Sequence, residues 1–160
     1  MPAAPAAPAA PAAPAAPAAP AAPAIESLLF VYGTLRKGGS NDMARLLPAA
    51  VRISGARMRG RLFDLGDYPA LVADACAGWV EGEIYAIPAH GWSALDALED
   101  VVSATHPQGE YLRVSGSAHD AHGTLSQCQV YVANPAVMRL DRPIAGGDWI
   151  DHVMSRDAGP

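Results

Sequence analysis

Hydrophobic and polar positions follow two spacings in the strand-like parts of the chain. Leu28 to Tyr32 is an almost continuous apolar run, as expected of a strand that is covered on both faces. Trp79 to Ile87 alternates between two faces, which predicts a strand paired within a sheet. Glycine and proline punctuate the remaining segments and predict further short elements. These are strands over Val51 to Leu65 (one or two, bent at Gly55 or Gly60), Ala70 to Val72, Tyr111 to Ser117 and Leu125 to Ala133, and short helices over Asp42 to Leu47 and from about Trp149.

A third spacing appears from His90 to Asp100, where Trp92, Leu95 and Glu99 fall at i, i+3 and i+7. This spacing predicts a helix whose apolar stripe faces the core. Strands therefore outnumber helices, and the two do not alternate regularly along the chain. The pattern predicts an α+β fold, in which a small mixed or antiparallel β-barrel is flanked by short helices.

The N-terminal segment has a different composition from the rest. Pro2 to Ala22 is seven copies of Pro-Ala-Ala, followed by Pro23-Ala24. Proline removes a backbone donor and disfavours the helical region for its neighbour, so we expect disorder or polyproline II here. The chain thus divides into a tail, residues 1–24, and one domain, residues 25–160. One interpretation of the tail is a spacer or an over-extended translation start. The other interpretation is a docking arm.

Charge and composition limit the partners that the domain can have. The formal net charge is −5, which argues against a nucleic-acid partner and favours a small molecule. No apolar run reaches the roughly 18 residues of a membrane span, so we expect no membrane partner. The two cysteines, Cys76 and Cys128, lack the number for a disulfide framework and the spacing for a metal site. We expect both to be core thiols in a reducing, cytoplasmic setting.

Glu99 is the carboxylate with the most unusual predicted position. Helical spacing places it on the stripe of Trp92 and Leu95, facing the core. A desolvated glutamate tends toward a raised pKa, which suits a general base near neutral pH. The alternative is that Glu99 lies in a fraying last turn and turns its side chain to solvent.

Other polar residues carry weaker signals. His119 and His122 form an H-x-x-H pair without further ligands nearby, so we predict exposed histidines and no metal site. Glu81 and Glu83 share a strand face with Tyr85, where a solvated or hydrogen-bonded role is expected. The chain has no nucleophile elbow and no phosphate-loop motif, so covalent catalysis is not indicated.

Seven segments together resemble the γ-glutamylcyclotransferase-like, or AIG2-like, family. In chain order they are FVYGTLRKGGSN, LFDLGDYPALV, VEGEIYAI, LDALED, EYLRV, VYVA and GGDWI. The likeness spans nearly all of Phe30 to Ile150, and its YGTL loop is the most specific part. Within that family likeness, the L-D-x-x-E of Leu95 to Glu99 also becomes informative.

The resemblance implies a small β-barrel and an enzyme that releases 5-oxoproline from γ-glutamyl compounds without a cofactor or metal. By this likeness Glu99 is the catalytic glutamate, and we expect Tyr111 near the pocket. The substrate-binding loop corresponds to Tyr32, Gly33, Thr34 and Leu35. Its backbone N–H groups are expected to hold an acidic small molecule.

Two departures from the family pattern concern the segment after Glu99. Asp100 replaces a glycine that is common there, and the stretch DVVSATHPQG is long and expected to rim the cavity. The substrate stays open between γ-glutamyl amines or amino acids, an isopeptide fragment such as γ-glutamyl-lysine, and a γ-glutamyl-protected intermediate. Two other functions stay open as well: a non-catalytic module that binds an acidic metabolite or peptide end, and a hydrolase that uses water. The sequence leaves the oligomeric state undetermined.

Overall fold

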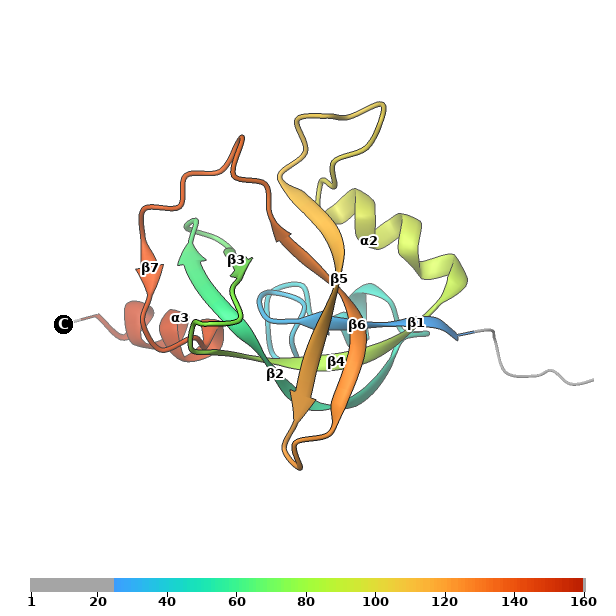
Figure 1. Ribbon diagram of the computed structural model, residues 1–160, viewed down its shortest axis with the longest axis horizontal. Coiled ribbons are helices and arrows are strands. Elements are labelled where there is room, and N and C mark those ends of the chain that lie inside the picture. Colours follow the sequence, from blue (N-terminus) through green and yellow to red (C-terminus); the bar gives the residue numbers. More distant parts are fainter. Residues whose placement is uncertain (1–24, 160) are drawn as a thin grey trace, which may run out of the picture.

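Five strands of the chain close into a barrel, with short helices and a small second sheet beside it (Figure 1). The computed structural model describes residues 25–159, so the tail predicted over residues 1–24 lies outside the described residues. The elements are β1 (Ile25–Val31), α1 (Met43–Leu46), β2 (Val51–Asp64), β3 (Pro69–Ala73), β4 (Trp79–Pro88), the 3₁₀ turn η1 (Ala89–Gly91), α2 (Trp92–Leu98), β5 (Tyr111–Asp120), β6 (Leu125–Ala133), β7 (Pro143–Ile144) and α3 (Trp149–Ala158).

The barrel is mixed, as the sequence predicts. Its strands follow the order β2-β4-β1-β6-β5, and β5 returns to β2 through the pairs Ala56↔Asp120 and Arg57↔His119. β1 pairs antiparallel with β4 but parallel with β6, where Leu29 lies opposite Gln129. The closed barrel with short flanking helices confirms the predicted α+β fold.

β1 is covered on both faces, which its apolar run predicted. Phe30 points into the barrel and packs in a buried cluster that includes Ile84 and Val130. Leu29 and Val31 point the other way and belong to a second buried cluster, with Trp92 and Leu95 of α2. The chain leaving β1 therefore emerges between the barrel interior and the helix.

β2 is one long strand that changes partners at Gly60. It pairs with β4 as far as Arg59 and with β3 from Gly60 onward. A Cβ at Gly60 would lie 2.7 Å from the Leu71 side chain and 2.8 Å from the Val72 carbonyl oxygen, so glycine permits this close approach. The predicted bend is therefore an exchange of partners within a continuous strand.

β7 is the element that sequence reasoning missed. It has two residues and pairs with the end of β2 through Leu62↔Ile144 and Phe63↔Pro143. A strand this short shows no periodicity, so no pattern marks it. β3, β2 and β7 together form the small sheet beside the barrel.

Asp64 at the end of β2 fastens the C-terminal helix to this small sheet. Its side chain is 4% exposed and accepts hydrogen bonds from Gly66 N–H (2.6 Å) and His152 Nε2 (2.7 Å). Arg142 and Arg156 also lie within 3.4 Å of its Oδ2. Burial opposes ionisation, but these donors and cations hold the pKa of Asp64 below its usual value. Figure 1 shows α3 lying beside β7 as a result.

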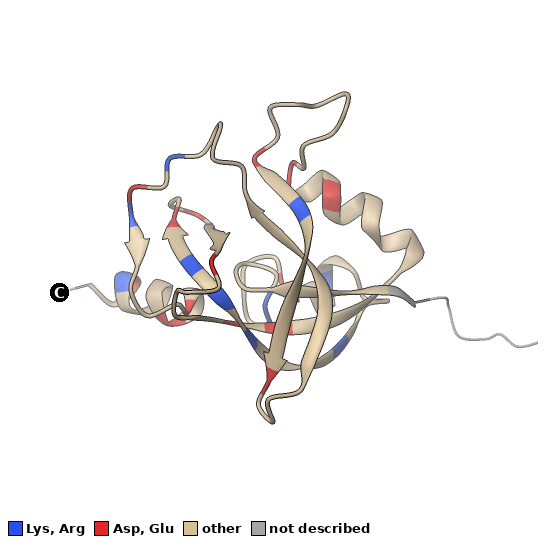
Figure 2. Ribbon diagram, viewed as in Figure 1, with Lys and Arg blue, Asp and Glu red and all other residues tan. Residues whose placement is uncertain are grey.

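The outer face of β2 is basic, and its arginines pack on an aromatic side chain. Figure 2 shows several blue positions along this strand. The guanidinium carbons of Arg57 and Arg59 lie 4.2 and 3.9 Å from the Trp79 ring centroid. Arg61 pairs with Asp74 at 3.6 Å. The arginines thus have partners within the fold.

The two cysteines, both predicted to be core thiols, differ in burial. Cys128 is buried, as predicted, but Cys76 is exposed, so the prediction of a core thiol there is wrong. Cys76 lies in the turn between β3 and β4, where the side chain of Asp74 accepts from its N–H at 2.9 Å.

Within residues 25–159, no helix combines the length and apolarity that crossing a membrane requires.

Candidate active site

The loop after β1 presents backbone donors that have no acceptor in the protein. The strand ends at Val31, and the chain turns so that Arg36 N–H donates to the Gly33 carbonyl at 3.1 Å. Among the described residues, no acceptor is found for the N–H groups of Gly33, Thr34 and Leu35. Three consecutive unpaired donors at a strand end form a concave anion-binding surface.

Gly33 is required by the neighbouring loop. A Cβ at this position would lie 2.7 Å from Cγ and 2.8 Å from Cδ of Pro69. Because the proline ring is stiff, it has little freedom to give way. The absence of a side chain at Gly33 therefore lets the Pro69 segment close directly over the loop.

Glu83 of β4 holds the far side of this loop. It is 6% exposed, and its Oε1 accepts the Lys37 N–H at 2.9 Å. Arg36 and Arg52 each place Nε 3.8 Å from this carboxylate. Of the two glutamates expected on a polar strand face, Glu83 is buried and hydrogen-bonded, whereas Glu81 is exposed.

The loop forms one wall of a pocket with an empty volume of about 330 Å³, open to solvent on one side. All six site residues that the sequence predicted lie around it, although they come from three separate segments. The lining residues are Phe30, Val31, Tyr32, Gly33, Thr34, Leu35, Tyr68, Pro69, Glu99, Tyr111 and Tyr131. Among these described residues none is basic, so the loop amides are the donors that face the pocket.

Glu99 enters the pocket from the end of α2. It is the C-cap residue of that helix, and its N–H donates to Leu95 C=O at 2.9 Å. The side chain is partly exposed, but its carboxylate has no hydrogen bond or ion pair with any described residue. Burial and the nearby charge of Glu110 raise the pKa of Glu99 to about 7. The helix end therefore points this carboxylate into the pocket.

Asp100 explains how the helix ends at that point. It has φ 53°, in the left-handed region that glycine adopts most easily. Its Oδ1 lies 2.6 Å from His106 Nε2 across the following loop. Asp100 therefore takes the place of the family's glycine in a strained backbone conformation, and its side chain has a local partner in His106.

Two buried tyrosines fix the shape of the pocket through their hydroxyl groups. Tyr32 donates to the Tyr131 carbonyl at 2.6 Å and accepts from Leu71 N–H at 3.3 Å. Tyr111 donates to the Pro69 carbonyl at 2.6 Å. Burial raises the pKa of both phenols well above the ordinary value, so both stay neutral. Their rings form apolar walls, and their hydroxyl groups are committed to the backbone.

The mouth of the pocket is acidic. Tyr68 donates to Glu110 Oε2 at 2.7 Å, and this bond raises the pKa of Tyr68 to about 12. A second hollow, with an empty volume of about 550 Å³, adjoins the pocket here and shares Thr34, Tyr68, Glu99 and Tyr111 with it. Its other lining residues are Ser40, Asn41, Asp67, Leu98 and Glu110. Figure 2 shows acidic positions both where α2 ends and where β5 begins.

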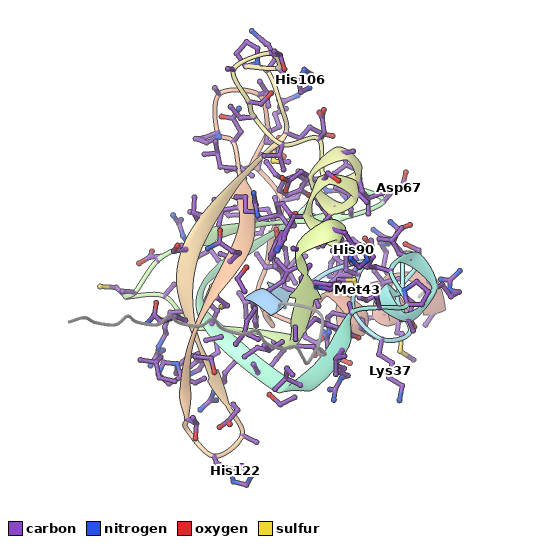
Figure 3. The ribbon with its side chains drawn as sticks, turned by 90° about the vertical axis from the view of Figure 1, so that its right-hand side faces the viewer. Lys37, Met43, Asp67, His90, His106 and His122 are labelled. Atoms are coloured by element: carbon purple, nitrogen blue, oxygen red, sulfur yellow. The ribbon has the colours of Figure 1, made fainter. Side chains whose placement is uncertain are left out.

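The long segment after Asp100 does not rim the cavity as expected. None of residues 101–109 lines either hollow; Glu110, which follows them, stands at the mouth instead. Figure 3 shows His106 at the tip of this loop, projecting away from the barrel, and His122 at the tip of the hairpin between β5 and β6. In the part of the chain that the structure describes, no group of three or more metal-ligating side chains is found.

Sequence reasoning missed several residues of the site. Tyr68 and Pro69 fall within the motif LFDLGDYPALV, but nothing in it indicates which residues reach the pocket. Tyr131 follows a plain strand pattern, and Glu110 lies in a loop. Their positions depend on pairing between distant strands, which local spacing does not encode.

The fold and the pocket together define a class: small mixed barrels that place a carboxylate of raised pKa opposite unpaired amides at a strand end. Comparison with known proteins identifies the family within this class. Residues 29–151 match the family described as gamma-glutamyl cyclotransferase, AIG2-like. The chain therefore belongs to this family, which confirms the resemblance found in its sequence, and it is an enzyme of that type.

Individual relatives agree with this assignment. A protein of Vibrio cholerae named "Putative gamma-glutamylcyclotransferase" is 39% identical over 129 residues, which are 81% of this chain and 100% of that protein. One of Halalkalibacterium halodurans with a name of the same kind is 38% identical over 93 residues, 58% of this chain and 79% of that protein.

Solved structures show the same fold. YkqA from Bacillus subtilis has a TM-score of 0.65 and 29% identity; 82% of this chain matches 42% of that one. An AIG2-like protein from Mus musculus has a TM-score of 0.55 and 25% identity, with 72% of this chain matching 84% of that one.

Proposed function

We propose that the protein is a γ-glutamyl cyclotransferase that releases 5-oxoproline from a γ-glutamyl amine, amino acid or related amide, with Glu99 as the general base. The observation that carries this proposal is the placement of an unpaired carboxylate of raised pKa across one pocket from three unpaired backbone donors. The substrate would be a small molecule bound between them.

The reaction needs one proton acceptor because the substrate contains its own nucleophile. Glu99 takes a proton from the substrate α-ammonium group, and the freed nitrogen attacks the γ-carbonyl carbon to close a five-membered ring. The γ-amide nitrogen of the tetrahedral intermediate receives the proton held by Glu99 and is expelled as the amine. The ring nitrogen gives its second proton, through the regenerated Glu99 carboxylate, to that amine, which leaves as an ammonium ion. The lactam C–N bond forms, the γ-amide C–N bond breaks, and the carboxylate is regenerated. A pKa of about 7 suits both transfers near neutral pH.

The backbone N–H groups of the loop supply the partial positive charge that complements the anionic groups of the substrate. The N–H groups of Gly33, Thr34 and Leu35 would bind the substrate α-carboxylate or the oxyanion that develops on the γ-carbonyl oxygen. Holding the carboxylate there orients the α-amine and γ-carbonyl toward each other. Well-oriented intramolecular partners reach effective concentrations on the order of 10⁵ M or more, so positioning accounts for much of the expected rate.

The tyrosine walls favour cyclisation over hydrolysis. The rings of Tyr32, Tyr111 and Tyr131 are buried and surround the carboxylate of Glu99. These apolar walls limit the water that reaches the carboxylate from the open side, and the tethered α-amine competes with that water at a much higher effective concentration. The departing amine would lie toward the mouth, beside Asp67 and Glu110. We propose a cytoplasmic setting, where γ-glutamyl metabolites occur, and a chemistry that requires no cofactor.

A panel of γ-glutamyl compounds tests the proposal. We expect 5-oxoproline and free amine in equal amounts from at least one compound, and a loss of at least about 10³-fold in kcat for Glu99→Gln. Ser93→Ala on the exposed side of α2 serves as the control and keeps activity. Unchanged activity in Glu99→Gln would remove the mechanism.

The products separate the competing functions. Glutamate in place of the lactam would indicate hydrolysis by water. Thermal stabilisation by 5-oxoproline or a γ-glutamyl amide, with no turnover of any panel member, would indicate a binding module that recognises an acidic metabolite.

A further inference from the structure

Three side chains from three elements meet where α2 lies on the barrel. Asp96 of α2 accepts a hydrogen bond from the Tyr131 hydroxyl of β6 at 2.8 Å. The same Oδ1 lies 3.2 Å from Nε of Arg113 on β5. The Arg113 guanidinium carbon in turn lies 4.6 Å from the centroid of the Trp92 ring, at the start of α2. The helix is thus bound to both strands near its beginning and near its end.

This contact bears directly on Glu99. Asp96 precedes Glu99 by three residues, so the two side chains lie on neighbouring parts of the same helix face. Leu95 between the helix and the barrel is fully buried and fixes the depth of packing. Tyr131 also lines the pocket, so a single hydrogen bond links the pocket wall to the helix that carries the carboxylate.

We propose that Asp96, Arg113 and Tyr131 form a positioning cluster that fixes the Glu99 carboxylate in the pocket, with the charges of Asp96 and Arg113 balanced against each other. The catalytic part of this inference rests on the proposed function. The part that concerns the position and the electrostatic surroundings of Glu99 can be tested on the protein without a substrate. The proposal also gives a physical role to two motif residues, the aspartate of L-D-x-x-E and the arginine of EYLRV.

The pairing of Asp96 with Arg113 matters for the Glu99 carboxylate because of the charges around that carboxylate. The titratable groups that line these hollows with Glu99 are Tyr111 of β5, Tyr131 of β6, Tyr32 of the first loop, and Asp67, Tyr68 and Glu110 of the loops before β3 and β5. None of these carries a positive charge. Asp96 and Arg113 are only 30% and 31% exposed, so removing either one leaves an uncompensated charge that solvent screens incompletely.

The first experiment follows the Glu99 carboxyl by ¹³C NMR as pH is varied, without substrate. Asp96→Asn keeps an acceptor for Tyr131 but leaves the Arg113 cation unpaired, so the Glu99 midpoint should fall by about 0.5 pH units. Arg113→Gln leaves the Asp96 anion unpaired, so the midpoint should rise by about as much. The double variant should return close to the wild-type value.

The second experiment measures kinetics on the γ-glutamyl panel. Tyr131→Phe and Asp96→Ala should each lower kcat about tenfold with little change in KM, because the base is displaced while the loop donors are intact. Their combination should cost no more than either alone. Asp96→Asn should recover most of the activity lost in Asp96→Ala. Arg139→Gln, which breaks the exposed 3.3 Å pair with Asp141, is the matched control and should change nothing.

The outcomes distinguish this inference from the proposed function. Opposite shifts of the Glu99 midpoint with no cyclisation of any compound would support the positioning cluster and reject the cyclotransferase. Cyclisation in the wild type, combined with shifts of the same sign or no shift in the two single variants, would reject the cluster. A loss in Tyr131→Phe confined to KM, or one that merely follows a loss of folded protein in circular dichroism, would also overturn it.

Discussion

Glu99 is a carboxylate that the fold holds without a cation. Its raised pKa arises from burial first and from Glu110 second, and no described residue donates a hydrogen bond to it. An ionised carboxylate in such surroundings is less stable than one in water. Two measurable properties of the protein follow from this single group.

The first is the pH dependence of turnover. A general base must be deprotonated, so kcat/KM should rise with pH through a midpoint near the Glu99 pKa of about 7. Glu110→Gln removes the neighbouring negative charge, so it should move this midpoint to lower pH. A series of initial rates from pH 5 to 9 measures both. A midpoint near the ordinary glutamate value would contradict the assignment of Glu99 as base.

The second property is stability. The folded pKa is raised above the ordinary glutamate value of 4.5, so the folded state binds the proton more tightly than the unfolded state does. The free energy of unfolding should therefore decrease as pH rises from about 4.5 to 7. Glu99→Gln should be more stable than wild type at pH 8 by about 1 to 3 kcal/mol, and by much less at pH 5. Urea unfolding at the two pH values measures this, and an equal effect at both would argue against it.

Gly33 has an equally specific role at the residue scale. Gly33→Ala would place a methyl group 2.7 Å from the Pro69 ring, so the loop and the Pro69 segment must separate. Because these segments form two walls of the pocket, we expect kcat/KM to fall by about 100-fold or more. Gly146→Ala, where a Cβ would meet nothing within 4 Å, is the matched control. Steady-state kinetics with equal activity in both variants would refute this.

At the scale of elements, the loop after β1 depends on β4. Glu83 accepts from Lys37 N–H and lies close to Arg36, which also donates to Asp148 Oδ1 at 2.9 Å. The loop is therefore fastened to β4 and to the N-cap residue of α3. These contacts are made on the side of the loop away from the pocket, which leaves its N–H groups free to face inward.

Replacing Glu83 tests this fastening. Glu83→Leu removes the acceptor of Lys37 N–H, leaves Arg52 without its buried counter-ion and leaves Arg36 with Asp148 alone, so stability should fall by about 2 to 4 kcal/mol. In the variant that still folds at low temperature, KM should rise at least about tenfold because the loop donors are no longer held in place. Glu81→Leu, at an exposed position of the same strand, is the control. An unchanged KM would show that the loop holds its shape without Glu83.

Most elements could be predicted from the sequence, because their side chains show a period. The run at β1, the alternation in β4 and the helical spacing of α2 each gave an element close to the observed bounds. β7 could not be predicted, since its two residues become a strand only by pairing with β2. The course of β2 was likewise open, because the partners that decide it lie far along the chain.

The same distinction applies to the pocket. Tyr32 to Leu35 and Glu99 stand in motifs, so a family likeness located them. Tyr68 and Tyr131 also stand in motifs, but they reach the pocket only because β6 pairs with β1 and the Pro69 segment packs against Gly33. Contacts between distant segments complete a site of which the motifs mark only a part.

At the scale of the whole molecule, the small sheet joins the barrel to the C-terminal helix. Asp64 is the common partner of His152 and Arg156 from α3 and of Arg142 from the preceding loop. Since its carboxylate is 4% exposed, these contacts are shielded from water and salt. Asp64 lines neither hollow of the site, although it pairs with Pro69 of the pocket wall, so we expect stability and turnover to be separable by mutation.

Asp64→Asn should demonstrate that separation. It leaves two arginines and a histidine without their counter-ion, so the free energy of unfolding should fall by about 2 to 4 kcal/mol at pH 7. The pKa of Asp64 is lowered, so the stabilisation it gives is present at neutral pH and is lost as pH falls below about 4. Hydrogen exchange should accelerate first in α3, while kcat/KM at low temperature stays unchanged. Uniform acceleration across the barrel would contradict a local attachment.

The unpaired donors of Gly33, Thr34 and Leu35 belong to the main chain, and this has an evolutionary consequence. Substituting the side chain of Thr34 or Leu35 leaves the N–H groups where they are, whereas only proline deletes one. Selection on this surface therefore acts on the path of the backbone, and on side chains chiefly where they hold that path, as the buried Leu35 does in the core.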